Sequence, residues 1–360
     1  MFFETQNLSN ALCVLSHALL KQGVWATRGK NAAGNRCLEF PGAVLVKINH
    51  PTNRYCFVEE RKWNKTLGWA ESLWLALGDN NLSMPGSYVK NLYSFSDDGV
   101  YMRAGYGPRI RRFGDNFTRY QIGDRVMYRQ YGDNHSGVGV DQLRFVIEKF
   151  KEDIGTREAV ITIHDPVADD FDRGNGDIPI LRTKDTPCTR SIHFMVVDGK
   201  MNCYVDMRSN DLIWGFSAVN VFNFTLMQEY IAMMVGVPVG AYYHKADNLH
   251  IYEGSYDLVK AIAEKYPENA YAEDGAVPYQ YPHTFTTLKE FDSWLQKLSN
   301  YEKGLRGADG DLPYSDEQAL EYLQDFAEEP LFLDWAKVFY CRWTKKPIEF
   351  TNPVLTTLFE

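Results

Sequence analysis

Residues 185–252 form the stretch that most constrains how this chain of 360 residues folds. Two apolar runs, 192–197 and 201–207, are separated by Asp198-Gly199, a dipeptide that favours a tight turn between antiparallel strands. A longer apolar run, 219–235, follows and has the length of a buried helix rather than a strand. The stretch therefore predicts a strand pair and a core helix, with polar residues between and beside them.

The polar residues of this stretch indicate a nucleophile beside an anion-binding pocket. Cys188 precedes the first predicted strand, Arg208 follows the second, and His250 and Tyr252 close the stretch. A cysteine accompanied by a cation and by hydrogen-bonding side chains is typical of nucleophilic catalysis. Each residue alone has a plainer interpretation, since a lone cysteine is more often a buried core residue. Their combination is what favours a functional site.

Charge and cysteine usage exclude several classes of protein. The net charge of −9 argues against a general affinity for nucleic acid or acidic membranes, although local arginines could still hold a small anion. The six cysteines are scattered, with no C-x-x-C pair and no metal-ligand spacing, so we expect reduced thiols and no metal. No apolar segment is long enough to span a membrane. The sequence therefore predicts a cytoplasmic protein that binds neither nucleic acid nor membranes.

Residues 69–77 predict a helix that carries a single carboxylate in apolar surroundings. Glu71 lies among Trp69, Leu73 and Trp74. Apolar surroundings raise the pKa of a carboxyl group, which allows it to exchange protons near neutral pH. The alternative is a structural glutamate near a helix N-terminus, where the helix dipole favours negative charge.

In kind, spacing and order, these segments resemble the thymidylate synthase family, which includes pyrimidine nucleotide hydroxymethylases. Residues 71–81, Glu-Ser-Leu-Trp-Leu-Ala-Leu-Gly-Asp-Asn-Asn, are similar to the family's Glu-Leu-Leu-Trp-Phe-Leu-x-Gly-Asp-Thr-Asn. Residues 104–107 resemble its Gly-Pro-Val-Tyr-Gly motif. Residues 141–143 and 156–161 resemble Asp-Gln-Leu followed by Ser-Arg-Arg-x-Ile, although Glu158 replaces the second arginine.

The resemblance implies an α/β fold with a thymidylate-synthase-like mixed sheet covered by helices. It covers residues 1–252, which we expect to form the catalytic domain. Residues 253–360 then form a helical C-terminal extension packed on that domain, with helices at 256–265, 288–298, 315–326 and 331–339. In the N-terminal part, residues 7–21 predict an opening helix with Ser9 as a candidate N-cap, and residues 43–48 predict a strand. Members of the family are homodimers, so we also expect a homodimer.

The chemistry implied by the resemblance is attack of the Cys188 thiolate on C6 of a pyrimidine nucleoside monophosphate. C5 then captures the methylene group of the co-substrate, 5,10-methylenetetrahydrofolate. A thiol needs a neighbouring cation to lower its pKa, and Arg208 is the candidate because guanidinium also suits phosphate. In a phage-encoded enzyme of this kind, the reaction would serve DNA modification in the host cytoplasm.

The resemblance also assigns roles to individual residues. The expected catalytic residues are Cys188, Glu71, Tyr106 and Asn220. The expected nucleotide-binding residues are Arg28, Arg157, Arg208, Ser209, His250 and Tyr252. The expected folate-binding residues are Asp211 and Trp74. Arg157 would reach the nucleotide of the partner subunit in the dimer, with Arg182 as a possible supplement.

Asn220 is expected to read the pyrimidine edge, and its choice depends on the register. It requires one extra residue between Gly215 and Asn220; without that residue, Val219 would take the position. An amide both donates and accepts hydrogen bonds, which suits uracil, whereas a carboxylate only accepts, which suits cytosine. The favoured substrate is therefore dUMP, with dCMP or CMP as alternatives.

Departures from the family pattern bear on the product. Thr189 and Met207 replace a histidine and a glutamine, residues 91–99 contain no tryptophan, and the last residues end in Glu360 instead of an apolar tail. A less tightly closed site admits water, which would give a 5-hydroxymethyl product instead of a methyl product. The alternatives are a methylating thymidylate synthase, a cysteine hydrolase using Cys188 with His193 or His250, and a catalytically silent nucleotide-binding protein.

Overall fold

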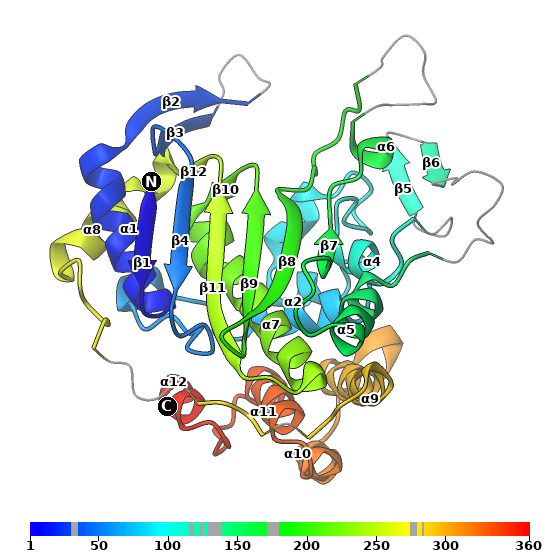
Figure 1. The fold of residues 1–360 in the computed structure, drawn as a ribbon. Coiled ribbons are helices and arrows are strands. Elements are labelled where there is room, and N and C mark those ends of the chain that lie inside the picture. Colours follow the sequence, from blue (N-terminus) through cyan, green and yellow to red (C-terminus); the bar gives the residue numbers. More distant parts are fainter. Residues whose placement is uncertain are drawn as a thin grey trace.

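The computed structural model describes residues 1–29, 35–114, 119–122, 125–128, 139–170, 180–273, 279–282 and 284–360. Its centre is a six-stranded sheet in the order β1-β4-β11-β9-β8-β7 (Figure 1). These strands are β1 Phe2–Thr5, β4 Val44–Ile48, β11 Val239–Ala246, β9 Lys200–Met207, β8 Thr189–Val197 and β7 Val160–Thr162. Both parallel and antiparallel pairs occur, so the predicted mixed sheet is confirmed.

The predicted hairpin is formed by β8 and β9. The two strands pair antiparallel, with Val197 opposite Lys200 and Thr189 opposite Met207. Asp198 and Gly199 both have positive φ angles, 51° and 72°. Two consecutive residues with positive φ make a type I′ turn, whose twist matches that of the paired strands. This turn fixes the register that brings Cys188 and Arg208 to the same end of the hairpin.

One face of the sheet is covered by α7 (Val221–Val235) and α2 (Leu67–Ala76), which lie behind the strands in Figure 1. Burial alternates along β11, where Tyr242, His244 and Ala246 are buried and Tyr243 and Lys245 are partly exposed. This alternation is expected of a sheet with one packed face. In the part of the chain that the structure describes, no helix lies across the opposite face (Figure 1).

A second, four-stranded sheet lies beside the first and carries polar residues expected at the nucleotide site. Its order is β10-β12-β3-β2, with β10 Asn210–Asp211, β12 Leu249–Tyr252, β3 Asn35–Glu39 and β2 Val24–Arg28. The opening helix, α1 (Leu8–Gln22), is present as predicted, but its N-cap is Asn7. Ser9 is not the cap, because it lies within the helix. Its hydroxyl donates to the Tyr55 carbonyl and accepts a hydrogen bond from the Phe57 amide.

The region after β12 is helical. Its helices are α8 Tyr256–Lys265, α9 Leu288–Arg306, α10 Asp316–Leu323, α11 Pro330–Thr344 and α12 Pro353–Phe359. The four predicted helices are confirmed, and α12 was missed. The indole of Trp335 in α11 donates to the carbonyl of Trp69 in α2 at 2.9 Å, so these helices share the core of the sheet region. The division at residue 252 stays a prediction.

Shorter elements complete the description. They are α3 Pro85–Tyr88, α4 Tyr106–Arg111, α5 Gln142–Glu152, α6 Pro166–Asp169, and the paired strands β5 Arg119–Ile122 and β6 Arg125–Tyr128. The side chain of Asp141 caps α5 by accepting a hydrogen bond from the Arg144 amide. None of the described helices combines the length and apolar character needed to cross a membrane.

Candidate active site

Cys188 and Arg208 lie side by side at the open end of the β8–β9 hairpin. Cys188 directly precedes β8, and Arg208 directly follows β9. The Arg208 amide donates to the Cys188 carbonyl at 2.9 Å, and Nη2 of Arg208 lies 3.6 Å from Sγ of Cys188. The guanidinium also donates to the carbonyls of Pro187 at 2.9 Å and Thr186 at 3.0 Å. Arg208 therefore contacts both the Cys188 thiol and the backbone of the two residues that precede it.

The pKa of Cys188 is raised overall in this structure, because burial outweighs the predicted lowering by Arg208. Burial raises the pKa of the thiol, Arg208 lowers it in part, and the carboxyl group of Asp185 raises it further. Sequence reasoning identified the cation but not the extent to which the loop buries the sulfur. Cys188 is half-buried, and its thiol ionises less readily in this structure than a free thiol.

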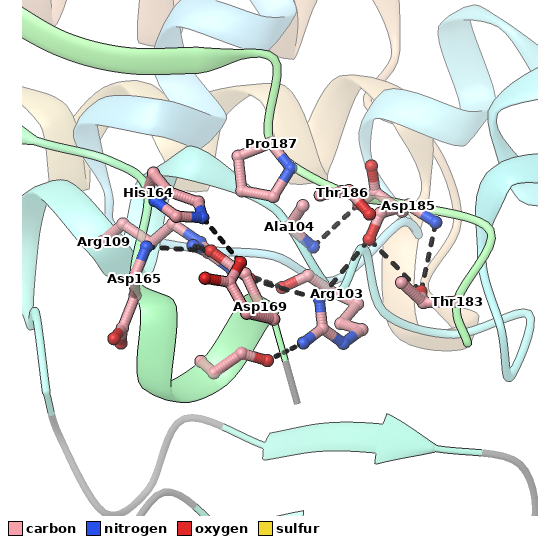
Figure 2. A network of polar contacts seen from close by, with 12 residues as sticks. Arg103, Ala104, Arg109, His164, Asp165, Asp169, Thr183, Asp185, Thr186 and Pro187 are labelled. Carbon is pink, nitrogen blue, oxygen red and sulfur yellow. Dashed lines mark hydrogen bonds and ion pairs between the residues drawn. The ribbon is translucent and has the colours of Figure 1, made fainter. Parts of the chain in front are cut away.

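Residues 103–106 hold the loop on both sides of Cys188. The Ala104 amide donates to Oδ2 of Asp185 at 2.7 Å, three residues before Cys188 (Figure 2). The hydroxyl of Tyr106 accepts a hydrogen bond from the Thr189 amide at 3.1 Å, one residue after Cys188. Tyr106 thus lies near the thiol. Burial, followed by the neighbouring Cys188, raises the pKa of its hydroxyl.

A buried ion-pair network supports these residues. The guanidinium of Arg109 donates to both carboxylate oxygens of Asp169, at 2.7 and 2.8 Å, and Arg103 contacts the same carboxylate at 3.3 Å (Figure 2). Arg103 also lies 3.4 Å from the carbonyl of Asp185. Because the charges are paired and hydrogen-bonded, the network fixes residues 103–109 against the loop that carries Cys188.

Glu71 has the elevated pKa that its apolar setting predicts. Burial in α2 raises its pKa to about 7, and a hydrogen bond from Asn223 opposes part of that effect. Nδ2 of Asn223 lies 3.1 Å from Oε2 of Glu71. A carboxyl group with a pKa near 7 both binds and releases a proton at the pH of the cell.

A pocket of about 490 Å³ contains five of the six predicted nucleotide-binding residues. It is lined by Arg28, Gly29, Asn35, Cys37, Arg208, Ser209, Asp247, Asn248, His250 and Tyr252. Its two arginines, Arg28 and Arg208, carry positive charge, and its carboxylate, Asp247, is ion-paired with Lys245 at 2.9 Å. The pocket therefore suits a phosphorylated ligand, and it adjoins the thiol because Arg208 belongs to both.

Strand β12 of the four-stranded sheet carries two of the polar residues that line this pocket. His250 and Tyr252 are two apart on β12 and therefore point to the same face. Their rings contact each other edge to face, with ring centroids 5.1 Å apart. Burial lowers the pKa of His250 although the nearby Asp211 opposes this effect, so the imidazole is neutral at pH 7. A neutral imidazole both donates and accepts, as a sugar hydroxyl requires.

Arg28 is fixed by a carboxylate that sequence reasoning missed. Nε of Arg28 donates to Oε2 of Glu39 at 3.0 Å, and Nη2 donates to the other oxygen. Asn248 also donates to Glu39 at 2.8 Å. These hydrogen bonds, led by that of Arg28, hold the pKa of Glu39 below its ordinary value. The contact uses one edge of the guanidinium and leaves the Nη1 side for a ligand. In the pairing of β2 with β3, Arg28 lies opposite Asn35 and Glu39 lies opposite Val24. The two long side chains therefore meet along the strand pair, which sequence alone does not show.

Asn220 lies at the end of a π-helical segment, Leu212–Asn220. A π-helix has i→i+5 hydrogen bonds and so accommodates an extra residue per turn, as the Asn220 register requires. Oδ1 of Asn220 accepts from Nδ2 of Asn210 at 2.8 Å. Gly215 lies against this amide pair, and a Cβ atom there would be 2.9 Å from both amides. The absence of a side chain at position 215 thus allows the two amides to meet.

Of the two predicted folate contacts, Asp211 has hydrogen-bond partners within the described residues and Trp74 has none for its indole nitrogen. The carboxylate of Asp211 caps the π-helical segment by accepting hydrogen bonds from the amides of Ile213, at 2.8 Å, and Trp214. Trp74 is 7% exposed, and its Nε1 is buried without a hydrogen-bond partner among the described residues. Trp214, three residues after Asp211, has a ring that is 40% exposed. Folate binding by Asp211 and Trp74 stays a prediction.

Arg157 is not part of the pocket within this chain. It lies exposed in the turn before β7. Its predicted action on a partner subunit stays a prediction. Among the described residues, no group of three or more histidine, cysteine or carboxylate side chains is placed to hold a metal ion.

Comparison with known proteins identifies the family. The family model described as Thymidylate synthase matches residues 14–302. A protein of Bacillus phage SP01 named deoxyuridylate hydroxymethyltransferase is 31% identical over 326 residues, which cover 88% of this chain and 78% of that protein. Proteins of the same name from Pseudomonas phage M6 and Delftia phage PhiW-14 are 29% and 28% identical, over 72% and 61% of this chain and 64% and 54% of their own lengths. The matched segments thus span less than two thirds of these last two relatives. The chain belongs to the thymidylate synthase family.

Proposed function

We propose that this protein is a folate-dependent one-carbon transferase that converts dUMP into 5-hydroxymethyl-dUMP. The observation that carries the proposal is the shared Arg208, which contacts the Cys188 thiol at 3.6 Å and also lines the pocket suited to a phosphorylated ligand. The three phage relatives named deoxyuridylate hydroxymethyltransferase support the choice of base and product.

In the proposed reaction, Arg28, Arg208 and Ser209 hold the phosphate, and His250 and Tyr252 bind the sugar. Such binding places C6 of the pyrimidine against Cys188. The thiolate adds to C6, the resulting enolate takes the methylene group of 5,10-methylenetetrahydrofolate at C5, and loss of the C5 proton with release of tetrahydrofolate leaves an exocyclic methylene group.

Water then completes the proposed reaction. Its oxygen forms a bond to the exocyclic methylene carbon and its proton is lost to the site. The electron pair returns through the ring and expels the Cys188 thiolate from C6. No hydride leaves the folate, so tetrahydrofolate is released without oxidation. Glu71, with its pKa of about 7, is the group proposed to exchange protons with the pyrimidine through bound water.

The competing classes have less support. Among the described residues, neither His193 nor His250 hydrogen-bonds Cys188, as a cysteine hydrolase would require. His193 instead lies opposite Tyr204 in the β8–β9 register, with ring centroids 6.0 Å apart. A catalytically silent nucleotide-binding protein would need neither a carboxyl group with a raised pKa, Glu71, nor a thiol beside the pocket, Cys188.

We also infer a cytoplasmic homodimer in which Arg157 acts on the partner's nucleotide. The uncovered face of the large sheet supports this assembly. It carries partly exposed aromatic residues, including Tyr204 and Tyr243, whose rings stack at 4.7 Å. Burial of such a face against a second copy would remove apolar surface from water.

The test is to incubate the protein with methylenetetrahydrofolate and dUMP, dCMP or CMP and to weigh the nucleotide product. We expect dUMP to gain one CH₂O group with tetrahydrofolate released. A gain of CH₂ with stoichiometric dihydrofolate would identify a methylating enzyme. Faster turnover of dCMP or CMP would contradict the choice of base, and no conversion of any nucleotide would contradict the function.

A further inference from the structure

Asn223 is a buried polar residue of α7 that faces the carboxylate of Glu71 in α2. It is 5% exposed. Its Nδ2 lies 3.1 Å from Oε2 of Glu71, and its Oδ1 accepts a hydrogen bond from the hydroxyl of Ser72 at 2.9 Å. Both ends of the amide are therefore engaged by consecutive residues of α2.

The hydrogen-bond partners fix the orientation of this amide. An ionised carboxylate only accepts hydrogen bonds, so the NH₂ group of Asn223 must face ionised Glu71. The amide oxygen is then turned toward Ser72, whose hydroxyl donates to it. Ser72 is 3% exposed, so water does not readily replace it in this role.

Packing alone does not explain an amide at position 223. The preceding and following residues, Phe222 and Phe224, are each 1% exposed, and an amide buried there costs free energy unless it is hydrogen-bonded. Burial and the Asn223 hydrogen bond are the two influences on the pKa of Glu71. Among the described residues, no charged side chain of the packed elements α3, α4, α7, α9 or Leu212–Asn220 contributes. Asn223 is thus what offsets the effect of burial on this carboxylate.

We propose that Asn223 is a positioning residue for Glu71, fixing the direction of its carboxylate and stabilising the ionised form, with Ser72 locking the amide. The contact itself does not depend on what the enzyme converts. Its role in catalysis rests on the function proposed above, in which Glu71 exchanges protons with the pyrimidine.

The direct test is a titration of Glu71 by NMR in protein labelled with ¹³C at the glutamate carboxyl carbon. The Glu71 signal is assigned by its loss in Glu71→Gln. In Asn223→Leu, we expect its titration midpoint to rise by about one to two pH units, the effect of removing one donor from a buried carboxylate. Ser72→Ala should raise the midpoint by a smaller amount, because the amide is then free to turn. An unchanged midpoint in both variants would overturn the proposal.

Two further measurements separate positioning from a merely structural role. Thr225→Val removes a buried hydroxyl of α7 that donates to the Val221 carbonyl at 2.7 Å and does not contact Glu71. It should lower the melting temperature without moving the Glu71 midpoint. If Asn223→Leu does not fold, the Glu71 midpoint of Ser72→Ala decides, and an unchanged midpoint in that variant overturns the proposal.

Release of tritium from C5 of labelled dUMP connects the contact to the reaction. The inflection of its pH profile should move upward with the NMR midpoint in Asn223→Leu, with the KM for dUMP unchanged. A midpoint that moves while the inflection stays would leave Asn223 as the positioning residue of Glu71 and contradict the catalytic role of Glu71 instead. Failure of the proposed function is thereby distinguished from failure of the contact.

Discussion

Replacement of Glu71 by glutamine should abolish turnover and make the protein more stable above neutral pH. The pKa of Glu71 is raised from its ordinary value of 4.5 to about 7 by burial. Between these two values the folded protein binds a proton that the unfolded chain does not, so the folded state loses stability as the pH rises from 4.5 to 7. Glutamine has the shape of the protonated acid and does not ionise.

The expected size follows from the shift in pKa. Each pKa unit corresponds to about 1.4 kcal/mol, so ionised Glu71 costs the folded protein about 3 kcal/mol at pH 8. Part of this cost is already present at pH 5, where the unfolded carboxyl group is mostly ionised. We therefore expect the advantage of Glu71→Gln over the wild type to grow by about 2 to 3 kcal/mol between pH 5 and pH 8.

Urea unfolding at pH 5 and pH 8, at one fixed protein concentration, measures this difference. Glu148→Gln, on the exposed side of α5, serves as the control for removing a carboxylate outside the site. If Glu71→Gln shows no growing advantage at pH 8, Glu71 is not a buried carboxyl group with a raised pKa. A variant that keeps wild-type turnover would show instead that Glu71 takes no part in the reaction.

Three other predictions concern the thiol and the base. Cys188→Ala should lose all turnover but still bind dUMP within a few-fold of the wild type, measured by calorimetry; retention of even a tenth of the turnover contradicts the covalent mechanism. Asp185→Asn keeps an oxygen for the Ala104 amide but removes the charge that raises the pKa of Cys188. The thiol should therefore react with iodoacetamide severalfold faster at pH 7.5, and a slower reaction would show that Asp185 does not act on the thiol electrostatically. Asn220→Asp should shift the ratio of kcat/KM for dUMP and dCMP toward dCMP by about 10- to 100-fold, as expected when a buried hydrogen-bond partner is changed; an unchanged ratio would remove Asn220 from base recognition.

Local patterns in the sequence were sufficient for many elements of this fold. The Asp198-Gly199 turn specifies its conformation through two residues that tolerate positive φ, and so the hairpin could be predicted. The helices after residue 252 were visible because apolar residues recur at helical spacing. The N-cap of α1 was misplaced because Asn7 and Ser9 are both capping residues, and only the backbone direction decides between them. The helix α12 was missed because it has seven residues, too few for a clear periodicity.

For the candidate site, the sequence predicted which residues come together more successfully than it predicted their burial and pKa values. Five predicted nucleotide residues line one pocket, and Tyr106 contacts the segment of Cys188. The net upward shift of the Cys188 pKa was missed because the nearby cation is visible in the sequence, whereas burial of the sulfur depends on how residues 103–109 and 185–189 pack. The π-helical segment that accommodates the register of Asn220 could not be distinguished from an ordinary helix by composition.

The sequence by itself determined the strand pair, the covering helices, the family and the residue types of the site, because these depend on neighbours along the chain and on motifs of a few residues. Only the tertiary structure decided which partners the functional groups have. Asn223 meets Glu71 across 152 positions, and Asn248 meets Glu39 across 209. Hydrogen bonds and burial over such separations set the pKa values of the carboxyl groups, and they arise only when strands and helices distant in the sequence pack together.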